Sequence, residues 1–289
     1  LLIMGIFWSC SVRPEPSWIQ NYPISDVYWH GIGAIEKPFT GVDIREAARS
    51  QALNAISSQI SVNIQSSFEN VISENNLKLD EFTNSVITTQ INSSLSSIEI
   101  LDTYENKNRY YVLIRLSKKK YFDDIELKRR NAIQSSLDLI KQAEQNFNSR
   151  SFNLLSDAMK EIAPYINYPI EIEYPSGSGT IINLYSYIKK IVNKYITRIK
   201  LELPVDIIEY NYGSQEKYKV EVKVFDQQSG DPISNIPIYS YINQLNKTPF
   251  ALTNNAGECS FSIPKVKYNR SIYHINYEID QKELFNDNI

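Results

Sequence analysis

Three segments in the first half of the chain alternate between apolar and polar residues, which is the pattern of strands with one buried face. They are residues 27–34, 97–104 and 109–116, and the polar stretch 105–108 between the last two predicts a hairpin. Strands joined in this way pair antiparallel, so the sequence predicts an antiparallel sheet.

A helix is predicted after the first strand. Asp43 is a candidate N-cap, and Glu46 stands at the spacing of a capping box. The repeated alanines on one face predict close packing against the sheet. This face carries Ile44, Ala48, Ala52, Ala55, Ile56 and Ile60. From Ile60 onward, Val62 and Ile64 alternate with polar residues, and this alternation predicts a further strand.

Helical spacing dominates residues 121–204. Two apolar stripes separated by a short break predict an antiparallel pair of helices. The first stripe is Ile133, Leu137, Ile140, Ala143 and Phe147, and the second is Phe152, Leu155, Ala158, Met159 and Ile162. A short strand is predicted over residues 170–174. The loop that follows predicts a third helix that already contains Ile181, with Ser178 or Thr180 as its N-cap.

From about residue 216 the apolar period becomes two, and turn residues recur between the apolar segments. This pattern predicts a small β-sandwich over residues 205–289. The expected fold class is therefore α+β in three parts. They are an antiparallel sheet backed by an alanine-rich helix over residues 27–120, a helical middle over residues 121–204, and the sandwich.

The first residues have the character of an export signal. Leu1–Trp8 is an unbroken apolar run, too short at about eight residues to span a bilayer, which needs about 20. Residues 1–10 are therefore interpreted as the remnant of a secretory signal, with lipidation at Cys10. Residues 11–26 contain three prolines and are interpreted as a tether. The alternative is a buried N-terminal strand.

Composition excludes some classes of function. The formal net charge is −3, so the basic excess typical of nucleic-acid binders is missing, and no nucleic-acid partner is expected. The chain has two cysteines, Cys10 and Cys259, which allow at most one disulfide. Cys259 lies in a strand-like segment and is interpreted as a small buried residue.

Candidate catalytic groups are few. Glu171 and Glu173 lie on the same face of a predicted strand and could serve as an acid–base pair. Because isoleucines alternate with them, the solvated side of a sheet is the preferred interpretation. The two histidines, His30 and His274, lie far apart in sequence and are interpreted as core or surface residues. No enzyme activity, cofactor or metal site is expected.

Twenty tyrosines are a more informative feature of the composition. Partly exposed tyrosines suit contacts with glycans or proteins, because each offers a large ring and one polar group. The alternative is an amphipathic edge of the core. The candidate binding surface consists of Tyr165, Tyr168, Tyr174, Tyr185 and Tyr187.

The ordered features Pro16-Ser17-Trp18, Tyr28-Trp29-His30-Gly31-Ile32-Gly33-Ala34 and the alanine-rich helix resemble the LPP-twenty type of bacterial lipoprotein over residues 16–120. The resemblance implies an outer-membrane lipoprotein, and some members are parts of flagellar basal-disk or outer-ring structures. No catalytic residues come with this family. Separately, Gly230-Asp231-Pro232-Ile233 and the turn at residues 253–258 are similar to transthyretin-like or carboxypeptidase-regulatory-like sandwiches, which serve as spacers or adhesive modules.

These inferences predict a lipid-anchored cell-envelope protein with a non-catalytic scaffolding or assembly role. The expected location is the outer membrane, facing the periplasm or the surface. The alternative is an adaptor or regulator of cell-wall machinery that binds peptidoglycan or an envelope enzyme. The expected partners are the membrane, through the lipid anchor, and envelope proteins or peptidoglycan, and a homo-oligomer stays open.

Overall fold

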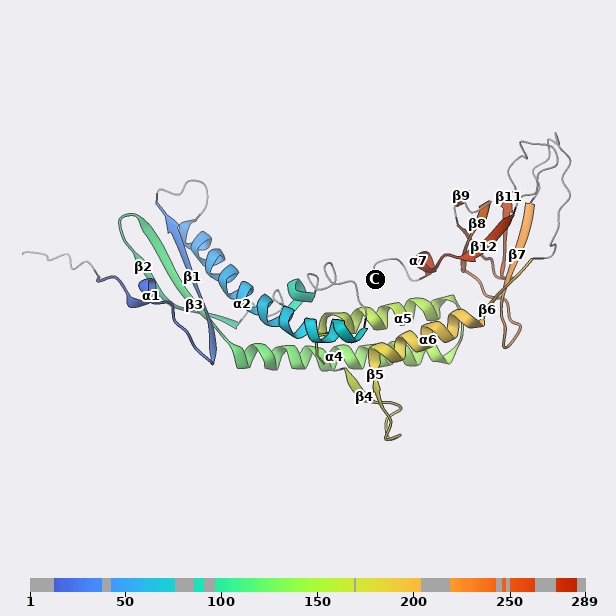
Figure 1. Cartoon of the computed structure of the whole chain (residues 1–289), viewed down its shortest axis with the longest axis horizontal. Helices are drawn as coiled ribbons and strands as arrows, with labels where there is room; N and C mark the ends of the chain where they lie inside the picture. The colour runs from blue at the N-terminus through green and yellow to red at the C-terminus, as the bar shows by residue number, and fades with distance from the viewer. Residues whose placement is uncertain are drawn as a thin grey trace, which may run out of the picture. The chain divides into compact units, whose positions relative to one another are not determined.

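A computed structural model of the chain describes residues 13–37, 43–75, 86–90, 97–168, 170–203, 219–242, 246–247, 250–262 and 274–284. The chain divides into two compact units, residues 1–128 and residues 129–289 (Figure 1). The helical middle and the C-terminal sheets both fall in the second unit. The three-part division predicted from the sequence stays a prediction, and Cys10 lies outside the described residues.

A three-stranded antiparallel sheet forms the first unit, as the alternating segments predict. It contains β1 (Tyr28–Glu36), β2 (Ile98–Glu105) and β3 (Arg109–Ser117), in the order β1-β3-β2. The β2–β3 hairpin forms where it was predicted. The side-chain oxygen of Asn106 accepts hydrogen bonds from the backbone N–H groups of Asn108 and Arg109, at 2.9 and 2.8 Å, which closes the turn.

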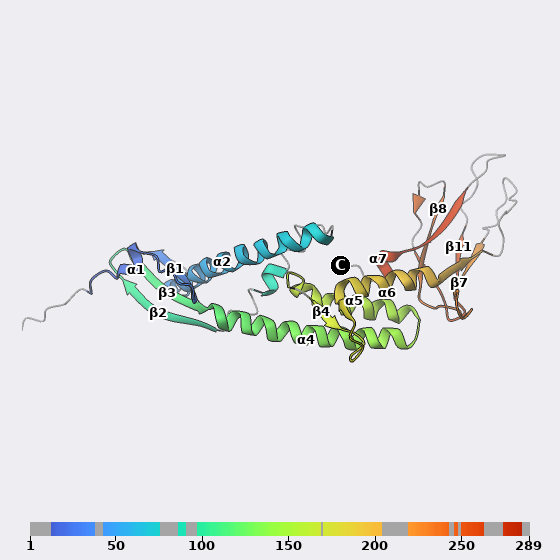
Figure 2. The same ribbon diagram turned by 60° about the horizontal axis from the view of Figure 1, so that its bottom comes forward.

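One face of this sheet is covered by the helix α2 (Ile44–Asn75), which lies along it in both views (Figures 1 and 2). The helix begins where it was predicted, because Asp43 Oδ1 accepts from the Arg45 N–H at 2.9 Å. Gly31 and Gly33 of β1 allow a close approach. A Cβ at Gly31 would lie 2.1 Å from the carbonyl oxygen of Ala52. Of the predicted alanine-rich face, four residues are buried, namely Ala48, Ala52, Ile56 and Ile60, while Ile44 and Ala55 are half-buried.

The strand predicted from Ile60 onward is wrong, because α2 continues through this segment to Asn75. Ile60 and Ile64 are buried, whereas Val62 between them is 68% exposed. A strand would place all three side chains on one face, but a helix places residues four apart on one face and the middle residue opposite. The observed burial therefore has the helical period.

Three helices form the first part of the second unit. α4 (Lys118–Gln145) begins within the first unit, and α5 (Ser149–Ile162) follows it as the predicted helical hairpin. Asn148 caps α5 in a capping box with Ser151. A short 3-10 helix, η2 (Ala163–Tyr165), ends this hairpin, and α6 (Leu184–Arg198) packs against α5. The predicted stripes are confirmed, since Ile140, Ala143, Phe152, Leu155, Ala158 and Ile162 are all fully buried.

The hairpin of β4 (Glu171–Glu173) and β5 (Ile181–Asn183) projects from these helices in Figure 1. The strand β4 was predicted, but β5 was expected to be helical. Asn183 caps α6 in place of Ser178 or Thr180, because its side chain accepts a hydrogen bond from the first turn of the helix at 3.1 Å. Pairing with β4 holds residues 181–183 extended, so the helix begins three residues later than predicted.

Two small antiparallel sheets complete the second unit, in agreement with the predicted C-terminal strands. One has the order β10-β8-β12 with β9 also on β8, and the other has the order β11-β7-β6. Phe261 and Tyr277 join the sheets, with ring centroids 5.4 Å apart. The likeness to transthyretin-like modules stays a prediction. The bounds are β6 (Ile199–Glu202), β7 (Lys219–Asp226), β8 (Pro237–Ile242), β9 (Asn246–Lys247), β10 (Ala251–Leu252), β11 (Glu258–Ser262), β12 (Ile275–Ile279) and α7 (Gln281–Leu284).

A buried ion pair lies where the helices meet the sheets of the second unit. The guanidinium of Arg198, the last residue of α6, donates to both carboxylate oxygens of Asp226 at the end of β7. Ser229 and the Gln228 N–H also donate to this carboxylate, at 3.0 and 3.1 Å. These bonds, led by that of Arg198, hold the pKa of Asp226 well below its usual range.

Candidate functional site

The segment that follows the candidate lipidation site is bound to the sheet of the first unit. The Arg13 guanidinium donates to both carboxylate oxygens of Asp102, at 3.1 and 2.9 Å, and to the Thr103 carbonyl at 3.0 Å. Trp18 lies in the short helix α1 (Ser17–Gln20), and its Nε1 donates to the same carboxylate at 3.0 Å. We call Arg13, Trp18 and Asp102 the N-terminal latch.

Aromatic packing and charge both support the latch. The Trp18 ring meets Tyr111 of β3 edge-on, with centroids 6.5 Å apart. The hydrogen bonds from Trp18 and then Arg13 hold the pKa of Asp102 below its ordinary value, although partial burial opposes this shift. Asp102 is therefore ionised at neutral pH and accepts three charge-assisted or indole hydrogen bonds.

A second contact binds the other end of the segment to β1. The Tyr22 hydroxyl donates to the carbonyl of His30, and Gln59 Nε2 of α2 donates to the same carbonyl at 2.8 Å and to Tyr22 Oη at 3.0 Å. Residues 13–22 thus differ from the tether predicted over residues 11–26. The three prolines of residues 11–26 led to the prediction of a tether. The polar and aromatic contacts could not be predicted, because they follow no periodic pattern in the sequence.

The latch limits how far the sheet can lie from a lipid on Cys10. Cys10 lies outside the described residues, but only two residues separate it from Arg13. Three peptide units span at most about 11 Å between the Cα atoms at their ends. A lipid at Cys10 would therefore hold the first unit close to the membrane, and not on a long flexible linker.

Two of the five predicted tyrosines come together in the second unit. The hydroxyls of Tyr174, which follows β4, and Tyr187 of α6 donate to the two carboxylate oxygens of Glu144 on α4, at 3.0 and 3.1 Å. Their ring centroids lie 5.2 Å apart. Burial and the bond to Glu144 raise the pKa of Tyr174 to about 12, and the same causes raise that of Tyr187. Both phenols therefore remain neutral donors at physiological pH.

Sequence reasoning missed Glu144, whose only signal is an acidic residue beside the first helical stripe. The other three tyrosines are half-buried. Tyr185 lies on α6, with Lys189 Nζ 5.5 Å from its ring centroid, while Tyr165 ends η2 and Tyr168 follows it. The structure thus joins one pair directly, and the role of all five in binding stays a prediction.

The carboxylates and histidines considered as catalytic candidates lie at separate places in the fold. Glu171 and Glu173 are exposed on β4, and Glu173 Oε1 accepts from the Gly179 N–H at 2.6 Å across the hairpin. His30 is buried in β1, and its burial, followed by the charge of Arg115, lowers its pKa. His274 is exposed. Within the described ranges, His, Cys, Asp and Glu side chains form no group of three that could hold a metal ion.

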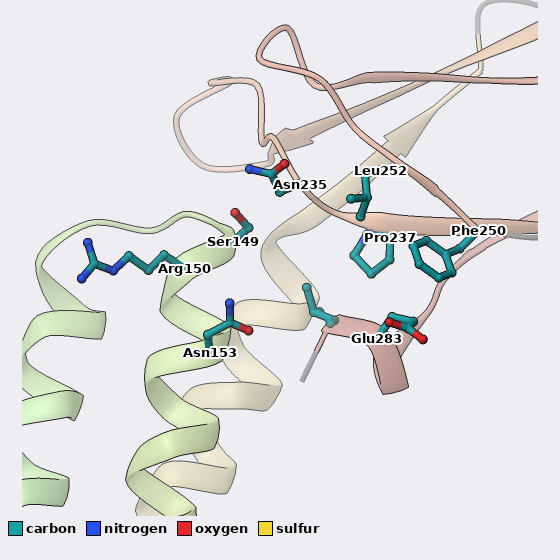
Figure 3. Close-up of a pocket in the computed structure, with 9 residues that line it drawn as sticks. Ser149, Arg150, Asn153, Asn235, Pro237, Phe250, Leu252 and Glu283 are labelled. Carbon is teal, nitrogen blue, oxygen red and sulfur yellow. The ribbon is translucent and has the colours of Figure 1, made fainter. Parts of the chain in front are cut away.

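A pocket of about 430 Å³ lies in the second unit between the N-terminal end of α5 and the strands β8 and β10 (Figure 3). Ser149 and Asn153 of α5 and Asn235 supply polar groups, while Pro237, Phe250 and Leu252 form an apolar wall. Arg150 and Glu283 also line the pocket, so apolar groups lie beside amide, hydroxyl and charged groups. This combination suits a polar ligand such as a sugar or a peptide. Sequence reasoning did not find this pocket, since its residues come from four separate segments.

Residues 16–117 match the LPP20 lipoprotein family. The match covers Trp18 and Asp102 of the latch, all three strands of the sheet, and α2. Arg13 and Cys10 precede it. We call residues 16–117 the LPP20-like region, and the sequence resemblance to this family is confirmed over it. It amounts to about a third of the chain, and the second unit lies outside it.

Comparisons with curated proteins and with solved structures give less information than the family match. No curated protein matches this chain. The chain is similar to the crystal structure of the secreted protein HP1454 from the human pathogen Helicobacter pylori, with 20% identity and a TM-score of 0.30. The similarity covers 57% of this chain and 60% of HP1454, so this chain spans less than two thirds of the length of HP1454. Among the helices of the described residues, none is long and apolar enough to cross a membrane.

Proposed function

We propose that this chain is a lipid-anchored, non-catalytic protein of the bacterial cell envelope with a scaffolding or assembly role. The match of residues 16–117 to a lipoprotein family carries this proposal. Cys10 lies six residues before the matched region and ends an apolar run of the kind found in export signals. The latch that follows Cys10 supports an anchor whose purpose is to hold the folded region near the membrane.

A structural role is supported by Asp102, Glu144 and Asp226, because each of their carboxylates accepts hydrogen bonds from neighbouring residues. Asp102 is bound by Arg13 and Trp18, and Glu144 is bound by two tyrosines. Asp226 is bound by Arg198, Ser229 and a backbone N–H. The bonds to Asp102 and Asp226 lower the pKa of each carboxyl, so both are stabilised as anions and make poor proton donors at neutral pH.

Site-specific photo-crosslinking in intact cells tests the scaffolding role. A benzoylphenylalanine in place of Tyr185 is expected to give discrete cross-links to envelope proteins. The same group in place of Lys190, on the exposed side of α6, serves as the matched control and is expected to give far fewer. If both positions gave only the same diffuse background, the proposed role of the tyrosine surface in assembly would be contradicted.

The second candidate function is an adaptor that binds peptidoglycan. The pocket between α5 and the strands β8 and β10 favours it, because its apolar wall and amide groups suit both the sugars and the peptides of the cell wall. Co-sedimentation with purified peptidoglycan separates the two functions. Phe250→Ser should abolish sedimentation if the pocket binds the cell wall. Ile181→Ser, which changes an exposed aliphatic residue of β5, should not.

A hydrolase is the third class. Glu171→Gln removes one member of the only carboxylate pair considered for acid–base chemistry. We expect this variant to complement a deletion strain fully, because Glu171 is an exposed residue of a short strand. If the Glu171→Gln variant folded normally but did not complement the deletion, the result would support a hydrolase and contradict a non-catalytic role.

A further inference from the structure

The edge strand β2 carries a β-bulge directly beside the latch. Ile100 lies opposite Ile114 and Asp102 lies opposite Leu113, so Leu101 has no partner of its own in β3. Ile100 and Leu101 are 55% and 41% exposed as whole residues. Two adjacent aliphatic residues therefore face solvent immediately before the carboxylate that binds Arg13 and Trp18.

We infer that Ile100 and Leu101 form a membrane-contact patch that enters the surface of the lipid layer to which Cys10 is anchored. This inference rests on the proposed lipid anchor. The short length of chain between Cys10 and Arg13 favours a lipid as the occupant. Arg13 lies within about 11 Å of Cys10, and its side chain bonds directly to Asp102, the residue that follows the patch. Ile100 and Leu101 are the exposed aliphatic residues of β2, and they directly precede Asp102 in the strand.

The charges around the patch are compatible with a lipid surface. Glu99 and Asp102 flank it on β2, and a carboxylate brought unpaired to an apolar layer would oppose insertion. Each is paired with an arginine: Glu99 with Arg115 at 2.8 Å, and Asp102 with Arg13 at 2.9 Å. The bond from Arg115 also holds the pKa of Glu99 below its ordinary value. Both negative charges next to the patch are therefore compensated within the protein.

The same features argue against a second copy of the chain as the occupant. An edge strand joins another strand through its free N–H and C=O groups. Here Arg13 occupies the Thr103 carbonyl, and the bulge at Leu101 interrupts the regular ladder. Both features obstruct the addition of a strand and leave the two aliphatic side chains as the available contact.

A chemically coupled anchor tests the patch without depending on lipidation in cells. The chain from Cys10 onward, which is the form that the proposed processing produces, is coupled at Cys10 to a maleimide carrying one myristoyl chain. Cys259 is buried and its pKa is raised to about 11, so it reacts slowly at neutral pH. One myristoyl chain binds membranes only marginally, so a second contribution is measurable. The probe is a vesicle of phosphatidylethanolamine and phosphatidylglycerol.

Replacing both patch residues, Ile100→Ser with Leu101→Ser, should weaken partitioning into these vesicles about tenfold. Val62→Ser is the matched control, because it makes the same kind of change at an exposed aliphatic residue of α2, and it should leave partitioning unchanged. Leu101→Trp should instead strengthen partitioning several-fold, since tryptophan favours the membrane interface. This opposite change tests the patch independently of the serine variant, because a misfolded protein would not gain affinity through one added indole ring.

The patch is refuted if the serine variant partitions like the parent, or if Val62→Ser loses as much. It is also refuted if the serine variant disrupts a dimer in sedimentation without vesicles, because the patch would then bind a second copy. Failure of the lipid anchor itself has a different signature. Cells would then leave Cys10 unlabelled by palmitate, whatever the coupled protein does on vesicles.

Discussion

The contact between β1 and α2 depends on the absence of a side chain at Gly33. A Cβ placed there lies 1.8 Å from the carbonyl oxygen of Ala48, 2.7 Å from its carbonyl carbon and 3.0 Å from the Ala52 nitrogen. These are backbone atoms of a long helix, which no side-chain rotation can move aside. In Gly33→Ala the helix has to retreat by more than about 1 Å, in a core that is packed as densely as an organic crystal.

The loss of stability in Gly33→Ala depends on which packed side chains the retreat of the helix separates from the sheet. Ala48, Ala52 and Ile56 are fully buried between the helix and the sheet, so all three lose contacts at once. Overpacking costs about 1–3 kcal/mol, and a clash with backbone belongs at the upper end of that range. We expect a loss of about 3 kcal/mol. With the usual dependence of unfolding on urea, this corresponds to a fall in the midpoint of about 1.5 M.

Tryptophan fluorescence isolates the unit in question. In the chain that begins at Cys10, both tryptophans, Trp18 and Trp29, belong to the first unit, so their emission during urea unfolding reports on that unit alone. Gly177→Ala is the control. It lies in the second unit, so the strain of an alanine at its φ of +80° should leave the tryptophan-detected midpoint of the first unit unchanged.

A double variant tests whether the clash at Gly33 involves backbone atoms or side chains. Adding Ala48→Gly to Gly33→Ala removes the methyl group of Ala48 but not its backbone oxygen, so it should not restore stability. Full restoration would show that the clash involves side chains. A tryptophan-detected midpoint for Gly33→Ala within experimental error of the parent would show that β1 and α2 do not pack as closely as described.

Three further predictions concern single polar contacts. Asp226→Asn leaves the guanidinium of Arg198 without its buried charge partner, and circular dichroism during urea unfolding should show a loss of about 3 kcal/mol; an unchanged curve would contradict the pairing. The lowered pKa of His30 means that the unfolded chain binds the proton first, so stability should fall as the pH drops below 6.5, and His30→Gln should reduce this slope, whereas an identical slope would exclude His30 as its source. Asp102→Ala releases the latch, and chymotrypsin should then cut after Trp18 about tenfold faster; an unchanged rate would mean that the latch does not protect the segment.

Local periodicity was enough to predict most of the strands and helices, although β5 was expected to be helical. The alternation in residues 109–116 and the i, i+4 spacing of Ala48, Ala52 and Ile56 each identify one element without reference to the rest of the chain. The same method failed where two periods coincide. Ile60, Val62 and Ile64 fit a strand as well as a helix, and burial against β1 and β3, which lies outside the local pattern, decides for the helix.

Contacts between distant polar residues were beyond the reach of such patterns. Arg13 and Asp102 lie 89 residues apart, and Glu144 and Tyr187 lie 43 residues apart. A single charged or aromatic residue has no period, and its partner is known only once the elements are placed. The sequence could therefore indicate Cys10 and the tyrosines as candidate sites, but not the latch that follows Cys10 or the carboxylate that joins two tyrosines.

The anchor at Cys10 is the claim on which the proposed function most depends. The chain, placed behind a complete secretory signal start and expressed in a bacterium, should incorporate radiolabelled palmitate and fractionate with membranes. Cys10→Ala should abolish the label and Cys259→Ser should keep it, because Cys259 is buried in the folded protein. A chain that stays unlabelled with Cys10 intact, or one that keeps its label in Cys10→Ala, would contradict the account.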